Sequence, residues 1–239
     1  MIGITERGDA SIHTEWIDKM YNMDAGIIIS KGLSPALQKG LLKHINKVIF
    51  HATTTGYGGT VVEPNSPRYV DRINSLYDFI KSGFPAKQIV LRVDPIICTE
   101  KGLQLASDVI RLGYEIGIRR FRYSYLDLYS HVNDRFLAAG LPIPKQDFKM
   151  AIHTLSSLHE EYGASSFESC AEIMSLSLHQ CGCISSRDLN VLNLDIELTG
   201  NKGQRSACIC PAQKIELLDN HQGKCQFKCI YCYWKDVNR

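Results

Sequence analysis

The alternation of short apolar segments with longer segments of helical periodicity constrains the fold of this chain more than any other feature. The apolar segments are residues 2–5, 26–30, 48–53, 88–94, 121–127, 165–172, 192–198 and 214–218. Between them, apolar residues recur every three or four positions, most clearly in residues 67–81, 99–112, 128–139 and 146–162. This alternation is typical of parallel βαβ units. It predicts an α/β fold consisting of a single (β/α) barrel, complete or partial.

The chain has 239 residues and contains no repeat or linker that would divide it. We therefore expect one barrel domain, residues 1–239, within which residues 206–239 form a cysteine-rich C-terminal segment. Hydrophobic residues make up 44% and charged residues 22%, which is ordinary for a globular protein. No apolar run reaches the length of a membrane span, and residues 1–7 do not resemble a secretory signal. A cytoplasmic protein without a membrane partner is expected.

Polar residues follow several of the predicted strands. The reactive groups of a parallel barrel lie at the carboxyl ends of its strands, so these side chains are expected to meet at one mouth. Arg92 and Asp94 share one face of the predicted strand 88–94, which leaves two interpretations, an ion pair inside the barrel or groups directed at a ligand. The predicted catalytic or orienting residues are Arg92, Asp94, Tyr125, Asp127 and Glu172.

Three cysteines near the C-terminus carry the strongest chemical signal. The chain has nine cysteines, an odd number with several in close pairs, which fits reduced thiols for metal better than a disulfide framework. Cys225, Cys229 and Cys232 have the spacing Cys-x3-Cys-x2-Cys. Three thiolates on one loop are enough to hold three irons of a 4Fe-4S cluster and leave the fourth iron open. Zinc is the competing metal, with Cys208 or Cys210 as the fourth ligand.

The spacing, with Tyr231 directly before the last cysteine, resembles the cluster loop of radical S-adenosylmethionine enzymes. The resemblance implies that the open iron binds S-adenosylmethionine. Tyr231 and the loop residues Thr55, Gly56 and Tyr57 are the predicted cofactor-binding positions. The usual enzymes carry this loop after the first strand, whereas here only seven residues follow Cys232. The barrel must therefore precede its cluster loop, as in a circular permutation.

A second set of cysteines consists of two Cys-x-Cys pairs. Cys181 and Cys183 form the first pair, and Cys208 and Cys210 form the second. If the pairs meet in space, they form a zinc site or an auxiliary cluster site. The alternative is that they are partly buried thiols without metal.

Several short segments together resemble one family over nearly the whole chain. They are ERGD (6–9), TGYG (55–58), EPN (63–65), LRVDPI (91–96), YLDLY (125–129), CAE (170–172) and the terminal cysteine motif. In this order they are similar to the bacterial and phage family catalogued as domain of unknown function 1848. That family is regarded as similar to radical enzymes and, in parts, to the spore photoproduct lyase group. The resemblance implies a bacterial protein, or a protein of the bacterial host of a phage. The similarity to the thymine-directed group suggests a nucleobase or modified thymidine, in DNA modification or repair, as the substrate.

These observations lead to three functional hypotheses. The preferred one is an iron–sulfur isomerase or lyase of the radical S-adenosylmethionine type, acting on a small molecule or a nucleobase in DNA and needing an electron donor. The second is an enzyme that binds its substrate directly at the open iron, without S-adenosylmethionine. The third is a zinc-stabilised module that binds nucleic acid without catalysis. The net charge of +2 neither requires nor excludes a nucleic-acid partner.

Overall fold

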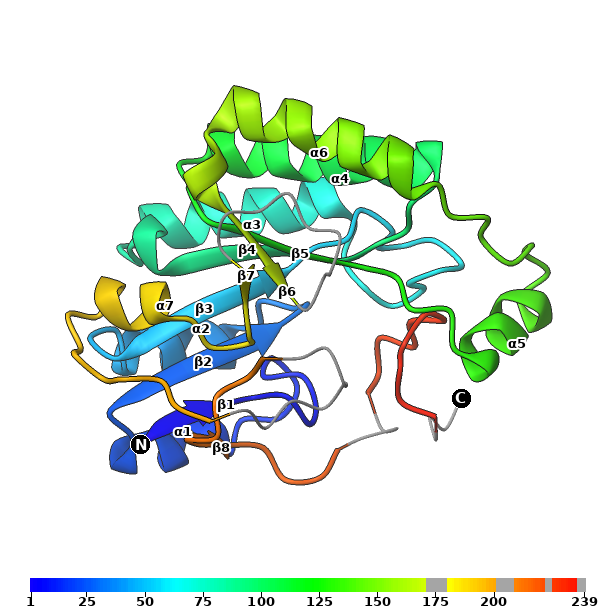
Figure 1. Ribbon diagram of the computed structural model, residues 1–239. Helices are drawn as coiled ribbons and strands as arrows, with labels where there is room; N and C mark the ends of the chain where they lie inside the picture. The colour runs from blue at the N-terminus through cyan, green and yellow to red at the C-terminus, as the bar shows by residue number, and fades with distance from the viewer. Residues whose placement is uncertain (171–179, 201–208, 222–224, 236–239) are drawn as a thin grey trace.

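Eight parallel strands form one curled sheet at the centre of the molecule (Figure 1). The computed structural model describes residues 1–170, 180–200, 209–221 and 225–235. The strands are β1 Ile2–Ile4, β2 Ala25–Ser30, β3 Val48–Thr53, β4 Ile89–Ile96, β5 Phe121–Tyr125, β6 Phe167–Cys170, β7 Gln180–Cys181 and β8 Lys214–Glu216. Their order is β7-β6-β5-β4-β3-β2-β1-β8. The predicted (β/α) barrel is thus confirmed in its partial form, and among the described residues the edge strands β7 and β8 share no ladder.

Helices connect the strands. They are α1 Trp16–Lys19, α2 Pro35–Lys43, α3 Tyr69–Lys81, α4 Glu100–Glu115, α5 Ser130–Ala138, α6 Phe148–Tyr162 and α7 Ser186–Val191, with the 3-10 turns η1 Met20–Asn22, η2 Ala86–Gln88 and η3 Ala164–Ser166. Side-chain caps begin several of them: the Ser34 and Asp147 side chains accept backbone N–H bonds at the first turns of α2 and α6. None of the helices in the described ranges is both long and apolar enough to span a bilayer.

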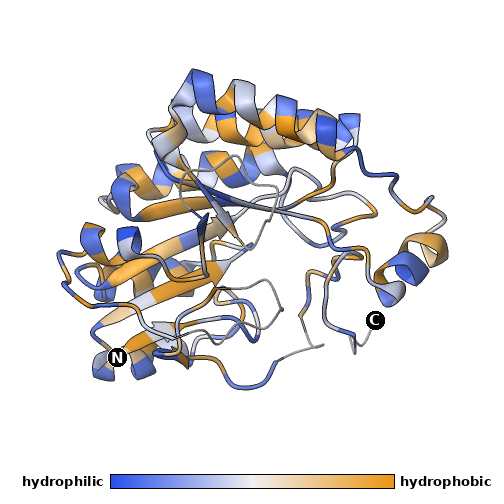
Figure 2. Ribbon diagram, in the orientation of Figure 1, coloured by the Kyte–Doolittle hydropathy of each residue, from blue (hydrophilic) through white to orange (hydrophobic). Residues whose placement is uncertain are grey.

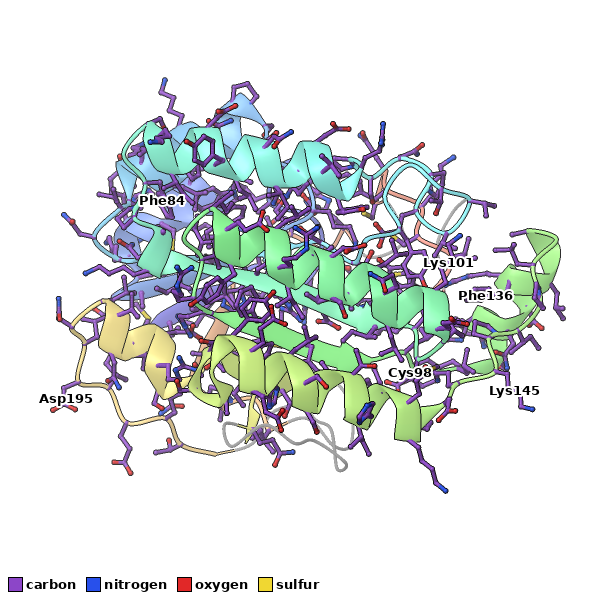
Figure 3. All side chains as sticks on the ribbon, turned by 90° about the horizontal axis from the view of Figure 1, so that it is seen from above. Phe84, Cys98, Lys101, Phe136, Lys145 and Asp195 are labelled. Carbon is purple, nitrogen blue, oxygen red and sulfur yellow. The ribbon has the colours of Figure 1, made fainter. Side chains whose placement is uncertain are left out.

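Two apolar layers lie on the two faces of the sheet. The outer layer is packed under α3, α4 and α6, which lie side by side across the strands in the view from above (Figure 3). The inner layer fills one end of the barrel and includes Ile4, Ile27, Ile49 and Val90. Figure 2 shows that the strands consist mostly of hydrophobic residues, whereas hydrophobic and hydrophilic residues alternate along the helices. Burial on both faces explains why the strands are near-continuous apolar runs.

The direction of β4 is visible in Figure 3, where Phe84 lies before the strand and Cys98 lies after it. Asp195 lies at the same end as Phe84, so the segment after α7 is at the amino ends of the strands. The prediction of a strand over residues 192–198 is wrong, because the described backbone there is irregular. Its apolar side chains Leu194, Ile196 and Leu198 instead pack against the inner apolar layer and cover that end.

The second half of the chain ends at two different places in the barrel. Residues 171–179 lie outside the described residues, and Gln180 begins β7. Residues 225–235 lie at the opposite end of the barrel from Asp195, beside α5 (Figure 1). The carboxyl ends of the strands are therefore the end where the terminal cysteines and the polar residues meet.

Candidate functional site

A cavity of about 290 Å³ lies at the carboxyl ends of the strands. Its wall is built from residues of β2 to β6, from the segments that follow β1, β2, β5 and β7, and from residues of the C-terminal segment. Four of the five predicted catalytic residues line it, namely Arg92, Asp94, Tyr125 and Asp127. The fifth, Glu172, lies outside the described residues. The position agrees with the general placement of sites in parallel barrels.

The three terminal cysteines all line this cavity. Cys229 is buried, while Cys225 and Cys232 are partly exposed. The loop turns back on itself at Lys228, whose φ is 52°, and the Cys232 backbone N–H then donates to the Cys229 carbonyl at 3.1 Å. The loop therefore gathers its thiols on one wall of the cavity.

The protonation of these thiols and the distances between them bear on which metal they can bind. Burial raises the pKa of the Cys225 thiol to about 11 and that of the Cys229 thiol to about 12, and the neighbouring thiols of the loop add to both shifts. The loop therefore becomes a set of thiolates only when a cation binds it. The thiols are close enough to influence one another's charge.

The sulfur atoms of the three terminal cysteines nevertheless lie farther apart than the ligands of a single metal ion. In the described ranges, Cys225, Cys229 and Cys232 do not form a set of donor atoms that all lie within 4.8 Å of one another. Zn–S bonds of about 2.3 Å would bring sulfurs within roughly 4 Å of each other. A cluster accepts a wider set, because each thiolate binds a different iron. A cluster accommodates such a set, and the metal that this loop binds stays a prediction.

Glu63 anchors the cysteine loop from below. Its carboxylate accepts hydrogen bonds from Lys31 Nζ at 3.0 Å, from Thr55 Oγ1 at 2.5 Å and from the Tyr231 hydroxyl. Lys31 Nζ also donates to the Tyr231 hydroxyl at 2.7 Å. Burial opposes the charge of Lys31, but Glu63 and Cys229 outweigh it and raise the pKa of this amine. A permanent cation therefore lies close to the Cys229 thiol.

The predicted cofactor-binding residues occupy two different places. Tyr231 lines the cavity, with its hydroxyl held by Lys31 and Glu63. Thr55, Gly56 and Tyr57 are absent from the cavity lining. Tyr57 instead belongs to the apolar cluster beneath the cysteine loop, which also contains Val62 and Ile230. The loop after β3 thus supports the cysteine loop from behind, and whether it contacts a cofactor stays a prediction.

A second support comes from α5 and the loop after β3. Arg135 donates to the backbone carbonyls of Cys232, Trp234 (2.6 Å) and Lys235 (3.0 Å). On the other side, the Ile230 N–H donates to the Val62 carbonyl at 3.0 Å and Asn65 Nδ2 donates to the Gln226 carbonyl at 2.6 Å. The backbone of the cysteine loop is therefore held at several points along its length by hydrogen bonds.

Arg92 and Asp94 form an ion pair that also faces the cavity. Ser124 Oγ donates to the same Asp94 carboxylate. Burial opposes the charge of Arg92, but Asp94, with Cys183 and Cys170, outweighs it and raises the pKa of the guanidinium. The pair is an internal ion pair that lines the cavity, and the interpretation that it is directed at a ligand stays a prediction. Asp127, in contrast, is exposed at the rim.

The family described as Domain of unknown function (DUF1848) matches residues 14–234. The chain belongs to this family. The matched range contains the three terminal cysteines and the four described catalytic candidates. The predicted family membership is thus confirmed for the DUF1848 chain. No curated protein and no solved structure matches it.

The second cysteine set of the DUF1848 chain is divided. The side chains of Cys181 and Cys170 are hydrogen-bonded, and this bond raises the pKa of the Cys170 thiol. Cys183 and Cys210 meet each other, with the Cys183 N–H donating to Cys210 Sγ at 3.2 Å. Cys208 lies outside the described residues. Of the predicted four-thiol set, the structure brings together one thiol from each pair.

Sequence reasoning missed a buried charge network beneath the cavity of the DUF1848 chain. Arg122 donates to Glu168 at 2.8 Å and to Asp188 at 3.3 Å, and Arg120 donates to the same two carboxylates at 3.1 and 2.7 Å. Burial would raise the pKa of both carboxyls, but the guanidiniums outweigh it and lower them. The available signal was the alternation of Arg120 and Arg122 with aromatic residues along a strand buried on both faces.

Proposed function

We propose that this chain is an iron–sulfur enzyme in which Cys225, Cys229 and Cys232 hold a 4Fe-4S cluster with one open iron. The observation that carries the proposal is the position of all three thiols on the wall of the one cavity that Arg92 and Asp94 also line. A donor set spread wider than a mononuclear triad supports a cluster over zinc. The pairing of β8 with β1 supports the permuted arrangement, because a loop after β8 reaches the same mouth as a loop after β1.

The proposed chemistry is that of the radical S-adenosylmethionine type. Such a cluster, when bound and reduced, supplies the electron that cleaves S-adenosylmethionine to a 5′-deoxyadenosyl radical. The chain itself supplies orientation and the exclusion of water. Lys31 offsets negative charge next to Cys229, and Arg135 and Glu63 hold the loop still.

The substrate class follows from the lining of the cavity. Its volume of about 290 Å³ is near the lower end of the range for small-molecule sites, which favours a compact substrate. Tyr125, Tyr233 and Trp234 provide aromatic faces for a flat ring. Arg92 and Asp94 provide a donor and an acceptor side by side for the polar edge of that ring. A nucleobase, in the free state or in DNA, satisfies these conditions, and the reaction class is a rearrangement or a bond cleavage.

The test is anaerobic purification of the full chain, followed by iron, sulfide and zinc analysis and electron paramagnetic resonance. The expected result is a brown protein with about four irons per chain, whose reduced signal changes on addition of S-adenosylmethionine with release of 5′-deoxyadenosine. Cys229→Ser should lose the cluster, whereas Cys98→Ser, a buried thiol of the outer layer, should retain it. If the cluster is present but its signal does not change when S-adenosylmethionine is added, the radical chemistry is refuted. Direct binding of the substrate at the open iron is then the remaining hypothesis. A colourless protein holding zinc at this loop would refute the proposal.

A further inference from the structure

A second group of metal-ligating atoms lies on the wall of the same cavity. One carboxylate oxygen of Glu6 and the Sγ atoms of Cys183 and Cys210 all lie within 4.8 Å of one another. Cys210 is fully buried, and Glu6 and Cys183 are partly exposed toward the cavity that all three line. They come from three separate places, after β1, after β7 and before β8. The group closes the gap between the two edge strands of the sheet.

The backbone around the two thiols is built for close approach. A Cβ on Gly182 would lie 2.7 Å from Cys210 Cα and 2.9 Å from Cys210 N, so only glycine allows these two segments to touch. The Cys183 N–H then donates to Cys210 Sγ. From inside the barrel, Arg122 Nη1 donates to the Cys183 carbonyl at 3.0 Å. The segments that carry the two sulfurs are therefore held together by a close backbone approach, by the hydrogen bond to Cys210 Sγ and by Arg122.

The charges around the group favour a divalent cation. Lys214 Nζ donates to one oxygen of the Glu6 carboxylate at 2.6 Å, and the Cys183 thiol interacts with the same carboxylate. Two thiolates and a carboxylate carry three negative charges, and a divalent ion together with Lys214 balances them. Arg92 also interacts electrostatically with Cys183. Lys214 thus takes the place of the outer partner that orients ligating carboxylates in metal sites.

We infer that Glu6, Cys183 and Cys210 bind a zinc ion on the cavity wall. Two thiolates and one carboxylate are zinc ligands, and Zn–S and Zn–O bonds of about 2.0–2.3 Å require only a small contraction of the observed group. Three protein ligands facing a cavity are the arrangement of catalytic zinc sites, in which water or a substrate oxygen takes the next position. Binding releases the thiol protons to solvent, so zinc affinity rises with pH.

The test isolates this site from the terminal cysteines. The full chain carrying Cys225→Ser, Cys229→Ser and Cys232→Ser is loaded with zinc or with cobalt, dialysed and assayed for bound metal. The expected result is about one ion per chain and, with cobalt, the visible and near-ultraviolet bands of a tetrahedral thiolate site. Adding Cys210→Ser should abolish binding, and adding Glu6→Gln should weaken it about 10-fold or more. Cys98→Ser is the matched thiol control.

Folding of each variant is checked separately by circular dichroism. If Cys210→Ser does not fold, Glu6→Gln, which preserves side-chain shape, is the variant used to test metal binding. Metal binding that is unchanged by both Glu6→Gln and Cys210→Ser would overturn the inference. So would a Cys183–Cys210 disulfide found by mass spectrometry in protein prepared anaerobically, because it would consume two of the ligands. The result does not depend on the terminal cluster, since its three cysteines are absent from the variant assayed.

Discussion

Arg122 Nη1 lies 3.0 Å from the carbonyl oxygen of Cys183 and donates a hydrogen bond to it inside the barrel. The same guanidinium also binds Glu168 and Asp188, which are completely buried. The charge network beneath the cavity is therefore joined directly to the segment that carries a cavity thiol. A rigid, fully buried support of this kind is what a site needs if its ligands are to stay in place.

Removing Arg122 should destabilise the protein strongly. Arg122→Ala leaves the buried Glu168 and Asp188 with Arg120 as their nearest remaining arginine, and Arg187 lies 3.9 Å from Glu168. Breaking a buried pair from one side typically costs about 3–5 kcal/mol. Urea unfolding followed by circular dichroism measures the change. Arg111→Ala, which removes an exposed helix pair with Glu115, should cost less than about 1 kcal/mol. Equal effects of the two substitutions would contradict the role of the network.

His51 should make the protein sensitive to mild acid. Burial, with Arg122 nearby, lowers the pKa of this imidazole to about 3, well below its ordinary value of 6.5. Between these values the unfolded chain binds a proton that the folded chain does not, so stability is lost as pH falls from 6.5 toward 3. The free energy of unfolding should therefore decline by up to about 1.4 kcal/mol more per pH unit than in His51→Leu. The exposed His153→Gln should keep the wild-type slope.

Glu63 and Tyr231 should differ in how much they contribute to the cysteine loop. Glu63→Gln removes the buried partner of Lys31 and should cost about 3–5 kcal/mol in unfolding free energy. Tyr231→Phe removes only hydroxyl bonds to charged groups and should cost about 2 kcal/mol. Tyr77→Phe, at an exposed ring of α3, is the control and should be near neutral. If Tyr231→Phe behaves like the control in thermal unfolding, the anchor is not made through this hydroxyl.

Arg135 should govern retention of metal by the loop rather than overall stability. Arg135→Ala releases the carbonyls of Cys232 and Trp234 from α5, so the last thiol is held less firmly. We expect several-fold faster loss of iron to a chelator, because positioning partners of this kind commonly change metal affinity by about 10–100-fold. The urea midpoint should shift little. Unchanged iron release, measured beside Arg111→Ala, would show that α5 does not position the loop.

The strands were predictable because each is a local apolar run. The runs at residues 48–53 and 214–218 contain β3 and β8, and the run at residues 26–30 falls within β2. The run at residues 192–198 alternates apolar and polar residues as a strand can, but it packs as an irregular cover through Leu194, Ile196 and Leu198 at the amino end of the barrel. Apolar composition predicts burial, and whether a buried segment joins a sheet depends on where its neighbours place it.

The face of β5 shows the limit of local reasoning at the site. Tyr125, one of the predicted catalytic residues, belongs with Tyr123 to the outer layer under the helices, although it also lines the cavity. The residues of β5 that meet the charges inside the barrel are Arg122 and Ser124. Alternation along a strand separates two faces without saying which is inside, and in a sheet buried on both sides hydrophobicity does not decide it.

The sequence by itself determined the parallel α/β architecture, the family and the three thiols of the terminal loop, because these are properties of neighbouring residues. The tertiary structure alone decided that Glu63 and Lys31 support Tyr231, that Arg122 reaches Cys183, and that Glu6 joins Cys183 and Cys210. These partners are separated in sequence, and Glu6, Cys183 and Cys210 meet because the sheet curls until β7 and the segment before β8 approach each other. The curl comes from the twist of the whole sheet, which no single segment encodes.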